Sequence, residues 1–402
     1  MSDQISCKIC GEDIDHVGNH LKQAHPSMSV EEYQASFPGA PLTSPRFDKM
    51  AAERLAQKQQ DQKITTGVQN MVAKILPFVP PNSVVKQPLH EAFEMPLDDT
   101  MRSPAKKGQT QGDPIMIDVM DRNALDAQSI EAIPDVDDGY VFRPDELKDL
   151  VMAIQLNIPT LVWGYHGAGK TTQVEQVCAR LNRPYLRVQH TDTTEESHIV
   201  GQMVVRNGAT EFDYGPLAEA MMRGWVYLAD EYDFAHPAVI AVYQAVLEGK
   251  PLYIKEAPPS QRLVKPHPHF RFIATGNTNG SGDDTGLYSG TKIGNAAAYS
   301  RFGITIQVDY PEQKTEIAIL KGKLPLTQDV AEKLVDFAGR IRTMYASGEI
   351  SLPISPRELI RAATIGVVKG GNFRRGIELA YSNRLDKTQG EAVSQTAQRV
   401  FG

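Results

Sequence analysis

The stretch Trp163–Thr172, WGYHGAGKTT, decides the fold of this chain. It contains the pattern G-x-x-x-x-G-K-[ST], follows an apolar run at 160–163 and precedes an amphipathic stretch at 174–181. The sequence therefore predicts a buried strand, a glycine-rich loop and a helix in that order. In such a loop, consecutive backbone N–H groups point at phosphate oxygens beside the positive end of the helix dipole. We expect a P-loop that binds ATP, built into a layered α/β domain.

The loop residues divide into glycines that shape the backbone and side chains that bind. We expect the nucleotide to be held by Gly164, Gly167, Gly169, Lys170, Thr171 and Thr172. The Lys170 ammonium is expected at the β- and γ-phosphates, and the Thr171 hydroxyl at Mg²⁺. ATP and Mg²⁺ are therefore the expected cofactors of this region. Cys178 falls on the apolar side of the following helix, where we expect a core residue without a redox role.

Two further apolar segments end in polar residues that would complete such a site. Trp225–Asp230 is followed by Glu231, so Asp230 is expected in the Mg²⁺ shell and Glu231 is expected to polarise the attacking water. The segment 270–275 leads to Asn277, whose amide would hydrogen-bond the γ-phosphate and that water. Capping a turn is the alternative role for Asn277. Together these residues predict hydrolysis of ATP as well as binding.

Two arginines further along the chain are candidates for contacts with the phosphates. Arg357 stands at the start of a predicted helix, from which it would fold back over the nucleotide. Arg301 precedes the predicted strand at 305–308, and we expect it to reach the γ-phosphate bound by a neighbouring chain. A surface salt bridge is the alternative role for Arg301.

A β-hairpin is predicted between the P-loop and the acidic segment. Asn207-Gly208 lies between two alternating runs in 202–212. Type I′ hairpin turns need positive φ at both central residues, a conformation that Asn and Gly adopt readily. In ATPases that carry such a hairpin as an insertion in the second helix of the core, it lines a central pore and touches the substrate.

From about Ile133 to the C-terminus the chain resembles the AAA+ ATPase subunits of aerobic cobaltochelatases, the CobS type of the MoxR-like clade. The segments that carry this resemblance are IPDVDDGYVF, WGYHGAGKTTQVEQVCARLN, LADEYDFAHP, VKPHPHFRFIATGNTNGSGDDTGLYSGT and ISPRELI. It implies a AAA+ core, a parallel sheet with helices on both faces, followed by a C-terminal helical lid. It also implies a hexameric ring that acts with a partner carrying a von Willebrand factor A (VWA) domain. The chain departs from the family at Ser300, where an acid usually precedes the arginine, and in its added N-terminal segment.

A Cys₂His₂ pattern with a short central spacer lies near the N-terminus. Cys7, Cys10, His20 and His25 are the expected zinc ligands, in the manner of a zinc finger. His16, one helical turn before His20, is the competing ligand, and the alternative is that none of these residues binds metal. Val17 is expected to supply the small core beneath the metal, and Ser29 and Glu32 to form a capping box.

Composition limits the class of protein. The net charge is −7 over 402 residues, with 41% hydrophobic and 23% charged residues, as in globular proteins that do not coat nucleic acid. No apolar run is long enough to span a bilayer, and the N-terminus has no signal peptide, so a cytoplasmic location without membrane contact is expected. Three cysteines argue against a secreted disulfide framework.

The chain is expected to divide into four parts: a zinc finger with a short helix at 1–45, a helical segment and flexible linker at 46–130, the ATPase core at 131–310 and the lid at 311–402. Apolar residues at helical spacing over 64–75 indicate the helical segment, and the polar stretch 98–114 indicates the linker.

The leading hypothesis for function is an ATP-driven ring that remodels or drives a partner complex. A MoxR-like chaperone, a DNA-associated ATPase recruited through the finger, and a true cobaltochelatase subunit are the alternatives. The finger carries Lys8 and Lys22 against Glu12, Asp13 and Asp15, which is a poor balance for phosphate contacts. We therefore favour a finger that docks on a protein partner.

Overall fold

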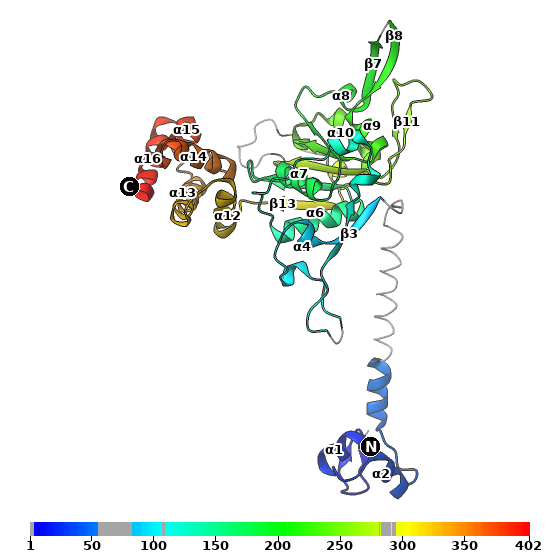
Figure 1. Cartoon of the computed structure of the whole chain (residues 1–402). Helices are drawn as coiled ribbons and strands as arrows, with labels where there is room; N and C mark the ends of the chain where they lie inside the picture. The colour runs from blue at the N-terminus through cyan, green and yellow to red at the C-terminus, as the bar shows by residue number, and fades with distance from the viewer. Residues whose placement is uncertain are drawn as a thin grey trace. The chain divides into compact units, whose positions relative to one another are not determined.

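The computed structural model describes residues 4–54, 83–106, 109–206, 208–280, 282, 291 and 295–402 (Figure 1). The chain divides into two compact units, Met1–Leu76 and Pro77–Gly402. The helix expected over 64–75 lies outside the described residues, and so does most of TGLYSGT (285–291), the end of one segment that carries the family resemblance.

The N-terminal unit begins with a small antiparallel hairpin, followed by two short helices. Its elements are β1 (Ile5–Ser6), β2 (Asp13–Ile14), α1 (Val17–Ala24) and α2 (Val30–Ser36). The Ser29 side chain accepts from the Glu32 backbone and the Glu32 side chain accepts from the Ser29 backbone, so the predicted capping box is confirmed. Val17 is buried in the core of this unit together with Cys7, as predicted.

A five-stranded parallel sheet forms the centre of the second unit. Its strands are β5 (Thr160–Gly164), β6 (Tyr185–Gln189), β9 (Val226–Asp230), β12 (Arg271–Gly276) and β13 (Ile304–Val308), in the order β13-β5-β12-β9-β6. β9 and β12 are buried along their whole length, as expected for central strands of a parallel sheet covered on both faces. The predicted α/β fold with a parallel sheet is confirmed.

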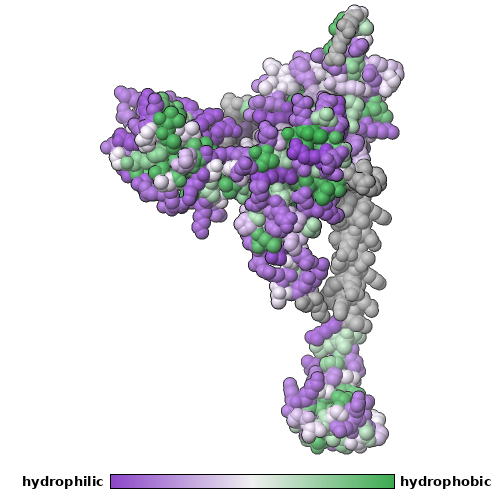
Figure 2. Space-filling model, viewed as in Figure 1, coloured by the Kyte–Doolittle hydropathy of each residue, from purple (hydrophilic) through white to green (hydrophobic). Residues whose placement is uncertain are grey.

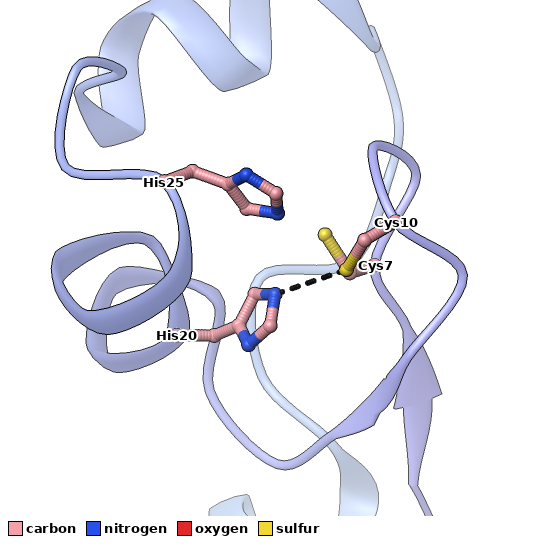
Figure 3. A group of neighbouring side chains, drawn as sticks. All are labelled: Cys7, Cys10, His20 and His25. Atoms are coloured by element: carbon pink, nitrogen blue, oxygen red, sulfur yellow. Dashed lines mark hydrogen bonds between the residues drawn. The ribbon is translucent and has the colours of Figure 1, made fainter.

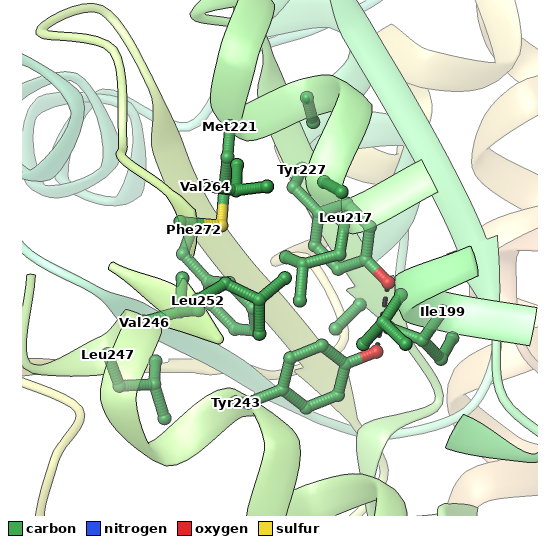
Figure 4. Close-up of a cluster of buried hydrophobic side chains, with 14 of the residues drawn as sticks. Ile199, Leu217, Met221, Tyr227, Tyr243, Val246, Leu247, Leu252, Val264 and Phe272 are labelled. Atoms are coloured by element: carbon green, nitrogen blue, oxygen red, sulfur yellow. Dashed lines mark hydrogen bonds between the residues drawn. The ribbon is translucent and has the colours of Figure 1, made fainter. Parts of the chain in front are cut away.

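Helices cover both faces of this sheet. Along β9, Val226 and Leu228 belong to one core cluster and Tyr227 and Ala229 to another, because successive side chains point to opposite faces. The first cluster contains residues of α6 (Pro144–Leu156) and α7 (Lys170–Arg180), among them the buried Cys178. The second contains residues of α9 (Pro216–Arg223) and α10 (Pro237–Leu247), and Figure 4 shows its centre. Cys178 is thus the core residue that the sequence predicted.

The described residues from 83 to 131 belong to the core, so the prediction of a linker there is wrong. The elements of this segment are β3 (Val84–Pro88), α4 (Leu89–Ala92), η1 (Asp99–Met101), β4 (Met116–Met120), η2 (Arg122–Ala124) and α5 (Ala127–Glu131). β3 pairs antiparallel with β4, and Leu89, Met101 and Ile117 are buried in the same cluster as α6 and α7. The polar composition of 98–114 suggested a linker, but single buried side chains within it hold the segment against the core.

The predicted hairpin is confirmed between α8 (Glu196–Val200) and α9. β7 (Gly201–Arg206) pairs antiparallel with β8 (Ala209–Tyr214), and the two strands project away from the sheet in Figure 1. Asn207 lies outside the described residues, and Gly208 has φ +79°. A second short hairpin, β10 (Leu252–Tyr253) with β11 (Leu263–Val264), precedes β12, and α11 (Ala296–Tyr299) precedes β13.

Helical elements alone follow β13, as predicted. They are α12 (Gln313–Lys323), α13 (Gln328–Ala346), α14 (Pro356–Val368), α15 (Phe373–Ala380), η4 (Ser382–Arg384) and α16 (Lys387–Phe401). These elements share one buried core and form the helical lid. Within the described residues, no helix is long and apolar enough to cross a membrane. The surface seen in Figure 2 is mostly hydrophilic, with separate hydrophobic patches.

Candidate functional sites

The P-loop connects β5 to α7 through glycines that no other residue could replace without strain. Gly164 has φ +143°, and a Cβ there would lie 2.1 Å from the backbone oxygen of Val308. Gly167 has φ +71°, and a Cβ there would lie 2.5 Å from the Ser355 hydroxyl at the start of α14. The loop therefore has the tight backbone expected of a phosphate cradle, and it lies directly beside the lid.

Lys170 is held at the centre of the loop by oxygen atoms. Its Nζ donates to the backbone oxygens of Gly164 at 2.8 Å and Tyr165 at 3.0 Å, and to Oδ1 of Asn277 at 3.0 Å. Burial lowers the pKa of Lys170 to about 8, although the carboxylates of Asp233 and Asp230 act in the opposite direction. The structure therefore brings together the lysine and the asparagine that the sequence singled out on separate segments.

The expected magnesium ligands lie next to each other. The Thr171 hydroxyl donates to Oδ1 of Asp230 at 2.9 Å, and the Thr275 hydroxyl also donates to that oxygen. Oδ2 of Asp230 accepts from Nε of Arg187 at 2.7 Å. A hydroxyl and a carboxylate beside the phosphate loop are the oxygen ligands that Mg²⁺ takes in nucleotide sites, so the residues fit this ion.

Glu231 takes a strained backbone conformation at the end of β9. Its φ is 55°, in the left-handed region that non-glycine residues rarely occupy. Its Oε2 accepts from Nε2 of Gln189 at 2.9 Å, and its N–H donates to the Thr275 hydroxyl at 3.3 Å. The bond from Gln189 holds the carboxylate and the bond to Thr275 holds the backbone. Glu231 therefore lies at the same end of the sheet as Asp230.

Several polar residues of this site, Thr275 among them, were not predicted from the sequence. Arg187 and Gln189 come from β6, the strand next to β9, and Asp233 follows Glu231. Asp233 is 2% exposed and accepts from the backbone N–H groups of Asn277 at 2.8 Å and Thr278 at 2.9 Å. Burial raises its pKa. The alternation of polar Arg187 and Gln189 in β6 was the signal in the sequence, because such residues share one face of a strand.

Two cavities flank the P-loop between core and lid. The first, of about 360 Å³, is lined by Gly139, Tyr140, Val141, Arg143, Gly167, Ala168, Gly169, Thr172, Pro311, Ile319, Lys323, Pro356, Arg357, Ile360 and Arg361. The second, of about 310 Å³, is lined by His166, Glu231, Phe234, Asn277, Tyr310, Leu352, Pro353, Ser355, Glu358 and Arg384. Arg357 thus lies beside the loop glycines, at the start of α14, as the sequence predicted.

Arg301 lines neither of these cavities. Its Nε donates to Oε1 of Glu248 at 2.8 Å, and its Nη1 donates to the backbone oxygen of Ala297. Glu248 is the C-terminal cap of α10 and also pairs with Lys250. The structure therefore shows the salt bridge that the sequence left open as the alternative role of Arg301, and it does not bring Arg301 to the P-loop of its own chain.

Four potential metal ligands converge in the N-terminal unit. The ligand atoms of Cys7, Cys10, His20 and His25 all lie within 4.8 Å of one another, as Figure 3 shows. Sγ of Cys10 is 3.3 Å from Nε2 of His20, and Nε2 of His25 is buried without a hydrogen-bond partner. His16 instead accepts from the Asn19 backbone at 3.2 Å and caps α1. Two thiols and two imidazoles at this spacing fit a tetrahedral zinc ion.

The chain is similar in sequence to several ATPases and ATPase domains. Residues 159–302 match the AAA domain (dynein-related subfamily), and residues 316–400 match the CbbQ/NirQ/NorQ C-terminal family. The aerobic cobaltochelatase subunit CobS of Sinorhizobium sp is 34% identical over 281 residues, covering 67% of this chain and 83% of the relative. Protein NorQ of Paracoccus denitrificans is 26% identical over 265 residues, which are 65% of this chain and 94% of NorQ.

A longer relative and a solved structure match parts of the chain. The mouse von Willebrand factor A domain-containing protein 8 is 29% identical over 235 residues, which are 55% of this chain and 12% of that protein. The crystal structure of a putative ATPase from Cytophaga hutchinsonii covers 68% of this chain and 92% of its own, at 16% identity and a TM-score of 0.35.

Proposed function

The chain belongs to the MoxR-like AAA+ ATPases related to the aerobic cobaltochelatase subunit CobS, and from this premise we propose that it is a ring motor acting on a partner complex with a VWA domain. The observation that carries the proposal is the ATP site itself, in which Lys170 contacts Asn277 while Arg301 lies outside both cavities beside the P-loop. An arginine that completes a neighbour's site requires the chain to assemble, and a closed hexamer is the arrangement we propose.

Within one chain, we assign each residue of the site a separate role in ATP hydrolysis. The Lys170 ammonium and the loop N–H groups bind the phosphates, while Thr171 and Asp230 hold Mg²⁺, which neutralises phosphate charge when it is bound. Glu231 accepts a proton from the attacking water, and Asn277 orients that water and the γ-phosphate. Arg357 contacts the nucleotide from the lid. These roles are supported by the hydrogen bonds that join Lys170 to Asn277 and Thr171 to Asp230.

The β7–β8 hairpin is our candidate for contact with the client. Met203 and Val205 lie on one face of β7, because side chains two residues apart in a strand point the same way, and they are 46% and 73% exposed. We propose that these side chains touch the partner complex. The VWA domain is suggested by the name of the mouse relative, and the cobaltochelatase name of the bacterial relative suggests a metal-insertion complex as one class of client.

We further propose that the N-terminal unit binds zinc through Cys7, Cys10, His20 and His25 and recruits a protein partner. The convergence of the four ligand atoms supports zinc binding. Two lysines against several acids in the finger favour a protein over DNA, because DNA binding relies on phosphate contacts from cations.

The motor is tested by separating nucleotide binding from hydrolysis and assembly. We expect Lys170→Ala to lose ATP binding, because the buried cation facing the phosphates is gone. Glu231→Gln should bind ATP, lose at least about 100-fold in turnover and accumulate as a closed oligomer, because only the proton acceptor is changed. Binding is measured by fluorescent-nucleotide titration, turnover by phosphate release, and assembly by mass photometry. Wild-type turnover in Glu231→Gln, or a monomer under saturating ATP, would contradict the proposal.

A further inference from the structure

The lid places two arginines in different cavities beside the P-loop. Arg357 lines the first cavity with Gly167, Gly169 and Thr172. Arg384, which ends η4 between α15 and α16, lines the second cavity with Glu231 and Asn277. The two cations therefore face different parts of a bound nucleotide, and no role described above uses Arg384.

The second cavity lies on the side of the terminal phosphate. A P-loop lysine reaches the β- and γ-phosphates, and Nζ of Lys170 is 3.0 Å from Oδ1 of Asn277. Asn277 and Glu231 both line the second cavity. From these positions we infer that the γ-phosphate and the attacking water bind between Lys170 and Glu231, next to this cavity.

Arg384 is the fixed cation of that cavity. Its Nη2 donates to Oε1 of Glu358 at 2.5 Å, and its guanidinium lies 5.8 Å from the centre of the Tyr381 ring. Glu358 is held in turn, because its Oε2 accepts from the backbone N–H of Ser355 at 2.7 Å and from its hydroxyl at 2.6 Å. A guanidinium has five N–H donors, so the bond to Glu358 orients Arg384 and leaves donors for an anion.

The other charged groups around the cavity are mainly carboxylates, so a γ-phosphate there needs a cation besides Lys170. Glu231 and Glu358 bring two carboxylates to its wall. His166 also lines the wall, but burial and the nearby Arg357 lower its pKa, so it adds no charge near neutral pH. Among the described residues that line this cavity, Arg384 is the one arginine or lysine.

We propose that Arg384 contacts the γ-phosphate of ATP from the lid of the same chain and so distinguishes ATP from ADP. Arg357, beside the loop glycines, contacts the nucleotide whichever of the two is bound. Glu358 contacts both Arg384 and Ser355 at the start of α14. When the γ-phosphate is lost, the lid therefore loses the contact that Arg384 makes with the nucleotide. This inference rests on the proposed nucleotide roles of the P-loop and deepens them.

The test compares affinities for ADP and for ATPγS with Mg²⁺ by calorimetry on the full chain. Arg384→Ala should bind ATPγS roughly tenfold to a hundredfold more weakly, because a charge-assisted hydrogen bond is lost, while its affinity for ADP stays within about twofold of wild type. Arg384→Lys should recover part of the loss. Arg340→Ala is the matched control, since Arg340 is a half-exposed lid arginine paired with Asp336 outside both cavities.

Three results would overturn the inference. Equal weakening for ADP and ATPγS would mean that Arg384 only supports the lid, and unchanged affinity for both would mean that it touches no phosphate. A lowered thermal midpoint of nucleotide-free Arg384→Ala, without selective loss of ATPγS, would also assign it a structural role. If Lys170→Ala still bound both nucleotides normally, the P-loop assignment itself would fail, which is a distinguishable outcome.

Discussion

At the scale of single residues, Lys170 links the loop backbone to the hydrolytic side chains. Burial lowers its pKa to about 8 in the nucleotide-free chain. A lysine is charged below its pKa, and only the ammonium form binds phosphates strongly. We therefore expect ATP affinity to be constant below about pH 8 and to fall by up to about tenfold per pH unit above it. Titration of fluorescent ATP from about pH 6.5 to about pH 9.5, a range that brackets this pKa, measures the change.

The same protonation gives the control for Lys170. Phosphates raise the lysine pKa in the complex, so binding above about pH 8 should take up a proton, and calorimetric heats should depend on the ionisation enthalpy of the buffer. Lys170→Arg keeps its charge throughout this range and should show weaker but pH-independent binding. A flat profile in the wild-type chain would mean that Lys170 stays charged despite its burial.

Local sequence was sufficient for residues that follow a motif and insufficient for residues brought in by strand pairing. Lys170, Thr171 and Asp230 were predicted because the P-loop and acidic patterns fix their chemistry. Arg187 and Gln189 were missed because their partners depend on the pairing of β6 with β9, where Gln189 lies opposite Asp230. Register of a parallel sheet is a long-range property that short patterns do not determine.

At the scale of elements, the composition of the segment from 83 to 131 wrongly predicted a linker. Short apolar runs in β5, β9 and β12 were easy to recognise because both faces of these strands are buried. In η1, by contrast, Met101 is the one buried residue of three, and β4 mixes buried Ile117 and Val119 with the exposed Met116. Burial of Met101 follows from its place in the core cluster beside α6, and no local period predicts it.

Two methionines of this segment provide a direct test. Met101 is 0% exposed and Met116 is 52% exposed. Met101→Ala should lower the free energy of unfolding of the ATPase unit by about 2–5 kcal/mol, because it opens a cavity in the core. Met116→Ala should change it by less than about 0.5 kcal/mol. Urea unfolding followed by fluorescence of Trp163 and Trp225 reports on this unit. Equal, small effects of both substitutions would restore the linker assignment.

The zinc finger is the second element open to test. We expect about one tightly held zinc per chain, lost in Cys7→Ser because a thiolate ligand is removed. His16→Ala should keep the metal, since His16 caps α1 and the four converging ligands exclude it. Metal analysis of purified variants measures both. A zinc-selective chelator, added with Mg²⁺ kept in excess, should unfold the N-terminal unit while ATP hydrolysis continues, and freshly purified protein without zinc would contradict the assignment.

At the scale of the whole molecule, Arg301 is the residue whose proposed role needs a second chain. Its guanidinium is occupied by Glu248 and by the Ala297 carbonyl, which also hold it in a defined orientation at the end of α10. The family usually has an acid directly before this arginine, and in this chain Ser300 stands there while Glu248 supplies a carboxylate from another helix. The sequence left a salt bridge open as the alternative role of Arg301, but it could not identify Glu248 as the partner, because that pairing depends on the fold.

The last prediction uses mixed assemblies to locate Arg301. In a ring, Lys170 and Glu231 of one chain would share a site with Arg301 of the next. An arginine supplied in trans contributes about 10³-fold or more to turnover, because it stabilises charge in the transition state. Arg301→Ala should therefore bind ATP normally and hydrolyse it at least about 10³-fold more slowly. Lys170→Ala should be inactive because it binds no ATP.

Mixing these two inactive variants distinguishes an arginine that acts between chains from one that acts within its own. In a mixed ring, some interfaces combine an intact P-loop from the Arg301→Ala chain with an intact arginine from the Lys170→Ala chain, so part of the activity should return. Mass spectrometry of the assemblies must first show that both variants occupy one ring. With mixing confirmed, absence of recovery at every ratio means that Arg301 acts within its own chain or that all sites must fire together. A ring of linked wild-type and Arg301→Ala chains separates these two cases, because graded activity excludes concerted firing and leaves Arg301 in its own chain.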